Sequence, residues 1–292
     1  MHKKMAQYVG RVTVTDGAWG TQLQARGLPA GGCPDAWNVE NPSAVEAVAA
    51  EYVQAGSRVI LTNTFRANRF VLGHWSLAER AGELAEAGAA ISRKAAGEAA
   101  AVFGSIGPTG KIVMMGEVAP EEIESAFAEQ AAALARGGAD AILCETFTEL
   151  DELRLAIRAG VQSTDLPVVA SMTFDSGPDK CHTMMGVAPG ELAAAAGELG
   201  AAAIGANCGA GPANYVNITR LLREATELPV WVKPNAGLPV TREGQTVFPM
   251  GPADFAGFVP ALVEAGASFI GGCCGTTPAH VREVRRRLER LA

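Results

Sequence analysis

Short apolar runs alternate with longer segments of helical periodicity along the whole chain. Eight of these runs are nearly continuously apolar, rather than alternating with polar residues, and they end in polar residues, glycine or cysteine. This pattern is typical of parallel strands whose two faces are both buried. We therefore expect strands at residues 11–16, 57–64, 101–107, 139–145, 166–173, 201–207, 228–235 and 267–274.

The segments between these strands are rich in alanine, glutamate and leucine at helical spacing. Most of them begin with a proline, which suits the first turn of a helix because the N–H groups there have no partner within the helix. We expect helices at residues 42–55, 77–98, 120–137, 149–159, 189–199, 212–225, 252–265 and 278–291.

An alternation of eight strands with eight helices predicts an α/β fold of the (β/α)8 TIM-barrel type. The alternative is an open, doubly wound sheet, but no GxGxxG motif follows the first expected strand. No linker and no change in composition marks an internal boundary, so we expect a single domain over residues 1–292.

The composition is that of a globular protein and narrows the range of partners. Hydrophobic residues make up 48% of the chain, charged residues make up 19%, and the formal net charge is −7. An acidic chain does not favour a nucleic-acid partner, and no apolar run approaches the roughly 20 residues of a membrane span. The N-terminal MHKK has no apolar stretch behind it, so we expect no signal peptide, a cytoplasmic location and reduced thiols for the six cysteines.

The candidate chemistry lies at the carboxyl ends of the expected strands, where barrels of this type hold their active sites. Cys208 follows the sixth expected strand, and Cys273 and Cys274 end the eighth. Three thiolates without a fourth cysteine nearby suggest a zinc site that keeps one coordination position open. The other polar residues at these ends are Asp16, Asn63, Thr64, Glu145, Thr146, Thr173, Asn207 and Asn235.

Adjacent side chains point to opposite faces of a strand, so Cys273 and Cys274 can meet one metal ion only where the chain leaves the strand. Gly271, Gly272 and Gly275 flank the pair and permit that departure. The residues alone leave two alternatives open, a strained redox disulfide between the neighbours and a chance pair. The CxxC spacing that is typical of structural zinc sites is absent from the sequence.

Five segments of the chain resemble the homocysteine S-methyltransferase family. They are DGAWGT at 16–21, TNTFRAN at 62–68, GANCG at 205–209, VKPNAG at 232–237 and GGCCGT at 271–276. Within that family the chain is most similar to the homocysteine-binding barrel of cobalamin-dependent methionine synthase. The resemblance runs from about residue 10 to about residue 285, and the GGCCGTTP segment with NCG upstream is its most specific part.

The resemblance implies a zinc-dependent enzyme that activates the thiol of homocysteine as a thiolate and methylates it to methionine. In that family, cysteines that match Cys208, Cys273 and Cys274 hold the Zn2+ ion. A residue that matches Asn235 is a weak fourth ligand, which the substrate thiol displaces when it arrives.

The resemblance also implies how the amino-acid part of homocysteine binds. Carboxylates that match Asp16 and Glu145 would meet its ammonium group. Its carboxylate would lie on backbone N–H groups of Gly20 and Thr21, near a helix start. Asn63 belongs to a segment that helps to shape the pocket.

The resemblance does not determine the identity of the methyl donor. The eighth expected helix is not followed by the folate- and cobalamin-binding modules of methionine synthase, so we expect a separate donor: a methylcobalamin protein, S-methylmethionine or a betaine. Trp19 stands where related sequences carry smaller or more flexible apolar groups, so the pocket mouth can differ as well. The alternative functions are a homocysteine- or thiol-binding module that presents its ligand to partner proteins, and a demethylase component that works with a separate corrinoid or folate protein.

Overall fold

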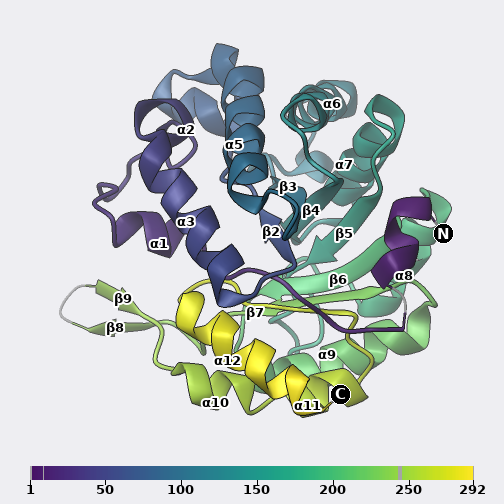
Figure 1. Ribbon diagram of the computed structural model, residues 1–292. Helices are drawn as coiled ribbons and strands as arrows, with labels where there is room; N and C mark the ends of the chain where they lie inside the picture. Colours follow the sequence, from purple (N-terminus) through teal and green to yellow (C-terminus); the bar gives the residue numbers. More distant parts are fainter. Residues whose placement is uncertain (1, 9, 243–244, 292) are drawn as a thin grey trace.

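The computed structural model describes residues 2–8, 10–242 and 245–291. Eight of its strands form one parallel sheet in the order β1-β10-β7-β6-β5-β4-β3-β2, and this sheet curls into a barrel (Figure 1). The two ends of the order meet at a single parallel bridge between Thr15 and Val59, which closes the ring. The structure thus confirms the expected single-domain (β/α)8 TIM barrel.

The barrel strands coincide with the eight expected apolar runs. The first and the last strand have two residues each, because the chain turns into a loop directly after them. The strands are β1 Thr13–Val14, β2 Val59–Leu61, β3 Ala101–Ile106, β4 Ala141–Phe147, β5 Val168–Met172, β6 Ala203–Cys208, β7 Val230–Pro234 and β10 Phe269–Ile270.

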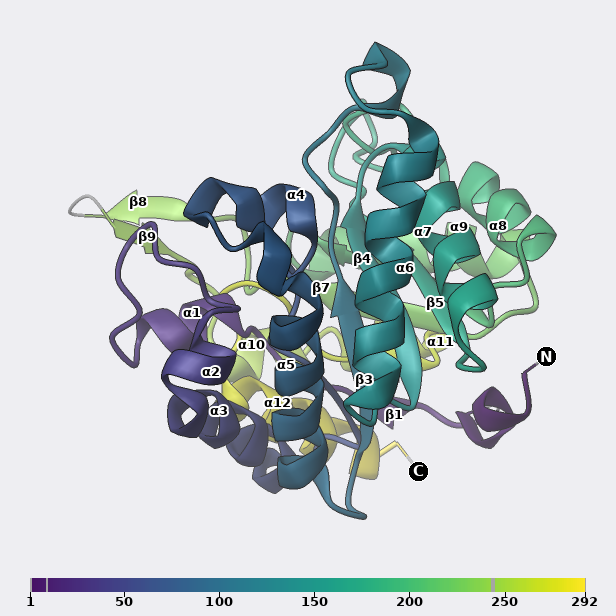
Figure 2. The same ribbon diagram turned by 90° about the horizontal axis from the view of Figure 1, so that it is seen from above.

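Helices cover the outside of the barrel (Figures 1 and 2). The longer ones are α3 Pro42–Ala55, α5 Ala81–Ala96, α6 Pro120–Arg136, α7 Leu150–Ser163, α8 Pro189–Glu198, α9 Pro212–Ala225 and α12 Pro278–Glu289. Shorter pieces lie in the connections: α1 Gly20–Gln24, α2 Trp37–Glu40, α4 Arg69–Leu72 and the 3-10 turns η2 Gly73–Trp75, η3 Ala78–Arg80 and η4 Val113–Met115. Of the helices that the described residues form, none is long and apolar enough to cross a membrane.

Two of the expected helices differ from the structure. The segment 252–265 forms two short helices, α10 Pro252–Ala256 and α11 Val259–Glu264. The break follows from Pro260, which has no N–H to donate to the carbonyl of Ala256. The segment expected to be helical from residue 77 becomes α-helical only at Ala81, after the 3-10 turn η3.

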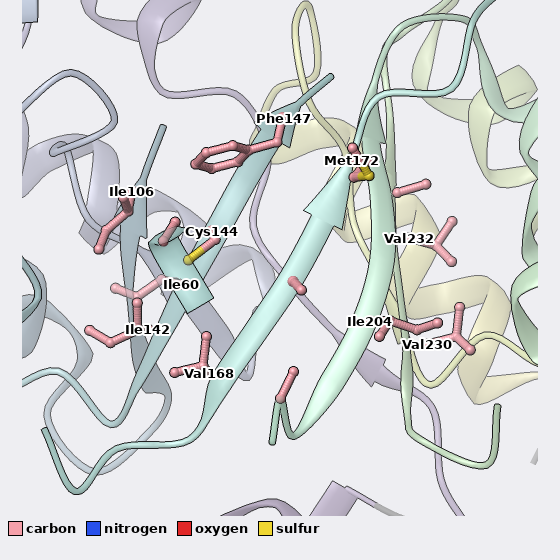
Figure 3. Close-up of a cluster of buried hydrophobic side chains, with 14 of the residues drawn as sticks. Ile60, Ile106, Ile142, Cys144, Phe147, Val168, Met172, Ile204, Val230 and Val232 are labelled. Carbon is pink, nitrogen blue, oxygen red and sulfur yellow. The ribbon is translucent and has the colours of Figure 1, made fainter. Parts of the chain in front are cut away.

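Alternate residues of the strands divide the core into two layers. Ile60, Ile142 and Ile204 belong to a large apolar cluster that joins the strands to the helices (Figure 3). The side chains of Trp231 and Phe269 belong to a second cluster in the barrel interior, where their ring centroids lie 5.2 Å apart. The barrel is therefore a packed core, and the space for a ligand lies above it at the strand ends.

A 3-10 helix before the first strand, η1 Lys3–Tyr8, covers the amino-terminal end of the barrel. Met5 and Tyr8 belong to the interior cluster. The Tyr8 ring centroid lies 5.0 Å from that of Phe269 and 6.2 Å from that of Phe103. The apolar pattern did not predict this element, because so short a segment shows no helical periodicity.

An antiparallel hairpin, β8 Val240–Arg242 with β9 Gln245–Val247, follows β7 and projects from the barrel in both views (Figures 1 and 2). This hairpin is also absent from the expected elements. Phe248, directly after it, packs against Gly275, where a Cβ atom would collide with the Phe248 side chain. The end of the hairpin therefore lies beside the glycine-rich turn that carries Cys273 and Cys274.

Candidate metal centre and substrate cavity

Three cysteine side chains meet at the carboxyl end of the barrel. Cys208 is the last residue of β6, and Cys273 and Cys274 follow β10, so the two groups lie on either side of β7. Their Sγ atoms all lie within 4.8 Å of one another. The structure thus brings together the three cysteines as the topology predicted, and the other three cysteines are buried outside this cluster.

The backbone around the cluster departs from regular strand geometry. Cys208 has a φ of 68°, in the left-handed region, which costs about 1–3 kcal/mol for a residue with a side chain. A Cβ atom at Gly271 would collide with the Thr15 hydroxyl, and one at Gly272 would collide with Thr276. The glycines therefore permit the close approach of this turn to its neighbours, which lets two successive cysteines face one point.

Asn235, at the end of β7, lies beside the cluster. Its Nδ2 donates to the Gly209 carbonyl at 2.6 Å, whereas its Oδ1 is buried without a hydrogen-bond partner. After Cys273 and Cys274, Asn235 is one of the groups that lower the pKa of the Cys208 thiol. The backbone N–H of Cys273 donates a hydrogen bond to the Pro234 carbonyl at 2.8 Å, which joins the cysteine turn to β7.

The three thiols share their protons. Hydrogen bonds from Cys273 and Cys274 lower the pKa of Cys208 to about 3. Donation to Cys208 in turn raises the pKa of Cys273 to about 12 and also raises that of Cys274. The side chains alone therefore favour one thiolate, and ionising all three requires a cation beside them. Three sulfur donors and an unpaired buried amide oxygen fit zinc, which takes four ligands and binds sulfur well.

A cavity of about 320 Å³ opens beside the cluster. Four residues predicted to contact a substrate, Gly20, Thr21, Asn63 and Glu145, line it together with the three cysteines. Gly20 and Thr21 form the first turn of α1, where backbone N–H groups have no partner within the helix. The Thr21 hydroxyl oxygen is buried there without a hydrogen-bond partner. The cavity therefore combines sulfur, carboxylate and unpaired polar groups.

Glu145, in the last part of β4, is one of the acidic residues of the cavity wall. Its Oε1 accepts the Ser105 hydroxyl at 2.5 Å, and its Oε2 accepts the Asn207 amide at 3.5 Å. Burial raises the pKa of Glu145 to about 7, although the positive charge of Lys233 opposes that shift. A positively charged ligand would offset the cost of burying this carboxylate.

Asp16 lies deeper than the cavity wall. Its side chain is fully buried and forms an ion pair with Lys233, and its Oδ2 accepts Trp19 Nε1 at 2.8 Å and Leu61 N–H at 2.7 Å. Of the described residues, Lys233 and Trp19 line the cavity and Asp16 does not. Lys233 was not among the site residues predicted from the sequence. The signal was a lysine within an otherwise apolar strand, since a buried lysine needs a counter-charge.

Asn63 and Asp35 belong to the part of the wall that lies next to α2. Asn63 Nδ2 donates to the Pro34 carbonyl at 2.7 Å and to Asn38 Oδ1 at 2.9 Å, which fixes the loop. Asp35 Oδ1 accepts the Arg66 N–H at 3.1 Å, and burial raises the pKa of this carboxyl to about 7. Asp35 was also missed, because it lies in a loop outside every expected strand and helix.

Known proteins are similar to this chain in sequence and in fold. The family model for homocysteine S-methyltransferase matches residues 13–288. The methionine synthase of Mycobacterium tuberculosis is 38% identical over 297 residues, which cover 94% of this chain and 24% of that protein. The chain thus spans about a quarter of the length of that relative.

Solved structures of the homocysteine methyltransferase MmuM from Escherichia coli have the same architecture. Its oxidized form matches with a TM-score of 0.80 at 25% identity, over 97% of this chain and 98% of that chain. Its metallated form matches with a TM-score of 0.81 at 24% identity, over 97% and 99% of the two chains. Since the family model covers nearly the whole barrel, these findings confirm the resemblance seen in the sequence: the chain belongs to the homocysteine S-methyltransferase family.

Proposed function

We propose that the chain is a zinc-dependent enzyme that transfers a methyl group to the thiol of homocysteine and so forms methionine. The observation that carries this proposal is the meeting of three cysteine sulfurs within 4.8 Å at the wall of a cavity that also contains Glu145. A thiol substrate with an ammonium group needs a soft cation for its sulfur and an acid for its nitrogen. Membership of the family supports both assignments.

Cys208, Cys273 and Cys274 would hold the zinc ion, and the unpaired Oδ1 of Asn235 would be the weak fourth donor that a substrate replaces. Zinc, when bound, supplies a positive charge that makes a coordinating substrate thiol a thiolate at neutral pH. This matters because a free thiol, with a pKa of about 8.5, is mostly protonated at pH 7, and the thiolate is the nucleophile.

The residues of the cavity would orient the amino-acid part of homocysteine. We assign the ammonium group to the carboxylates of Asp16 and Glu145, and the carboxylate to the N–H groups of Gly20 and Thr21, with Asn63 shaping the wall. Charge-assisted hydrogen bonds at both groups would fix the direction of the sulfur. Such orientation of two reacting groups can contribute roughly 7–11 kcal/mol to lowering the barrier.

In the reaction, the substrate sulfur uses an electron pair to form a bond to the methyl carbon. The bond between that carbon and the donor atom breaks, and its electron pair stays with the donor. The donor must therefore carry its methyl group on a good leaving atom. A methylcobalamin protein, S-methylmethionine and a betaine all meet this requirement.

A second candidate function follows from the share of the relative that the chain covers. Because the chain matches 24% of the methionine synthase, its barrel can act as one part of a larger system. In that case it would be a homocysteine- or thiol-binding module, or a demethylase component, that works with a separate corrinoid or folate protein.

A donor screen tests these proposals. Zinc-loaded protein is incubated with homocysteine and, in turn, methylcobalamin, S-methylmethionine or betaine, and methionine is measured. Methionine formed from a small-molecule donor without any partner protein would exclude the binding module.

Two cysteine variants complete the test. We expect Cys273→Ala to lose both stoichiometric zinc and methionine formation. Cys33→Ala, which changes a cysteine outside the cluster, should retain both. Full activity of Cys273→Ala would overturn the proposed role of the cluster.

We also propose a cytoplasmic location. The six cysteines are free, which supports a reducing compartment. Fractionation of cells that express the full-length protein, followed by immunoblotting of each fraction, tests this location.

A further inference from the structure

Lys233, on β7, has no role in the function proposed above. Its side chain is 1% exposed, and its ammonium group pairs with Oδ1 of the fully buried Asp16. Lys233 lines the substrate cavity, whereas Asp16, of the described residues near it, does not. The positive member of this ion pair therefore stands between the Asp16 carboxylate and the space that a substrate would fill.

Asp16 already has three hydrogen-bond donors. Oδ1 takes the Lys233 ammonium, and Oδ2 takes the Trp19 indole N–H at 2.8 Å and the Leu61 N–H at 2.7 Å. An ionised carboxylate offers about four lone-pair sites. Since its side chain is fully buried, Asp16 would reach a substrate ammonium only after Lys233 moved away.

The Glu145 carboxylate can accept a further hydrogen bond. One of its oxygens accepts the Ser105 hydroxyl at 2.5 Å, but the other has only the Asn207 amide, at the long distance of 3.5 Å. Glu145 lines the cavity. Its amide partner Asn207 directly precedes Cys208 of the cluster in the chain. In homocysteine a few bonds separate the nitrogen from the sulfur, so the partner of the ammonium must lie near the cysteines.

We propose that Lys233 is a positioning residue that occupies Asp16 and thereby makes Glu145 the carboxylate that receives the ammonium group of the substrate. This inference rests on the proposed function and refines the role that it gives to Asp16. The formal charges are consistent with this assignment. Asp16, Lys233 and Glu145 together carry one negative charge, and the single ammonium group of the substrate balances it. Without Lys233, two buried carboxylates would face that single ammonium group.

Asp35 is the other carboxylate on the cavity wall. The charged group that acts on it is Arg66, whose charge lowers the pKa of Asp35 against the larger effect of burial. Glu145 accepts the side-chain amide of Asn207, the residue directly before Cys208, whereas Asp35 accepts the backbone N–H of Arg66, outside the cluster. Glu145 is therefore the better placed of the two for a ligand whose sulfur lies at the cluster.

The test compares two thiols that differ only in the amino group, homocysteine and 4-mercaptobutyrate. Calorimetry on the zinc-loaded full chain gives the Kd of each, and the ratio of the two values measures recognition of the ammonium group. We expect Glu145→Gln to lower the preference for homocysteine by about 10- to 100-fold, the value of a hydrogen bond to a charged group. The double variant Glu145→Gln/Lys233→Gln frees the Asp16 carboxylate from its ion pair, and we expect it to regain part of the preference for homocysteine that Glu145→Gln alone loses.

Several outcomes would overturn this inference without overturning the proposed function. They are a loss of preference in the double variant as large as in Glu145→Gln, an unchanged preference in Glu145→Gln, and transfer of the effect to Asp35→Asn. Zinc content and melting temperature identify any variant that fails to fold, and if the double variant does so, the Glu145→Gln and Asp35→Asn measurements decide. A wild-type protein that binds neither thiol would overturn the proposed function, and this inference with it.

Discussion

The Thr276 hydroxyl accepts the Ala18 N–H at 3.1 Å and donates to the Cys273 carbonyl at 2.7 Å. This one side chain joins the loop after β1 to the turn that carries two of the three clustered cysteines. Tyr52, from α3, strengthens the junction because its hydroxyl donates to the Ala18 carbonyl at 2.6 Å. Hydrogen bonds that do not touch the sulfurs therefore hold the position of the turn.

Replacing Thr276 by valine tests this junction. The variant keeps the volume but leaves the Ala18 N–H buried without its partner, so we expect the free energy of unfolding to fall by about 1–3 kcal/mol. We also expect zinc affinity to fall by about 10- to 100-fold, as for other groups that support metal ligands. Competition with a chelator and denaturant unfolding measure the two effects. Thr276→Ser, which keeps the hydroxyl, is the control, and unchanged zinc affinity in Thr276→Val would contradict the role of the junction.

Tyr8→Ala should lower the stability of the fold without changing the affinity of the cysteine cluster for zinc. Tyr8 packs against Phe103 and Phe269 at the amino-terminal end of the barrel, and removal of a buried aromatic ring costs about 3–5 kcal/mol. We expect a loss of that size in denaturant unfolding, with unchanged zinc affinity, because the cysteine cluster lies at the opposite end. Tyr8→Phe keeps the ring and should lose much less. A parallel loss of zinc affinity in Tyr8→Ala would show that the two ends are coupled.

Zinc should stabilise the fold through the three clustered cysteines. A ligand at about 100 times its Kd raises the free energy of unfolding by about 2.7 kcal/mol when it binds only the folded state. We expect an increment of this order, reduced by any zinc that the unfolded thiols bind, and we expect Cys274→Ser to abolish it. Cys33→Ser, outside the cluster, should keep it. Equal increments in both variants, measured by thermal unfolding with and without zinc, would argue against this site.

The barrel could be predicted because its signals are local. A run buried on both faces is apolar throughout, and the helices between such runs show their own period, so each strand and helix is visible in a short window. The 3-10 helix η1 was missed because its evidence is tertiary: Tyr8 is buried by contact with Phe103 and Phe269, which are far away in the sequence. The hairpin β8–β9 was missed for a similar reason, because Phe248 at its end packs against Gly275, which is far away in the sequence.

Part of the candidate site could also be predicted from the sequence. The cluster of Cys208, Cys273 and Cys274 follows from strand order alone, since parallel strands deliver their carboxyl ends to one rim. The position of Asp16 behind Lys233 could not be predicted, because it depends on the directions of two side chains from β1 and β7, which β10 separates in the sheet. The lysine within an apolar strand indicated that a buried acid must exist, but not which one.

Asp35 should make stability depend on pH. Burial raises its pKa in the folded protein to about 7, from an ordinary value of 3.8. Between these values the unfolded chain ionises the carboxyl while the folded chain keeps it protonated, so this group lowers stability as the pH rises and has no further effect above pH 7. We therefore expect Asp35→Asn, which can still accept the Arg66 N–H, to match the wild type near pH 4 and to exceed it increasingly up to pH 7, by at most about 1.4 kcal/mol per pH unit. Denaturant unfolding of the zinc-free proteins between pH 4 and pH 8 measures the difference. Asp165→Asn, at an exposed position, is the matched control, and a constant offset between Asp35→Asn and the wild type would show that the carboxyl does not titrate in this range.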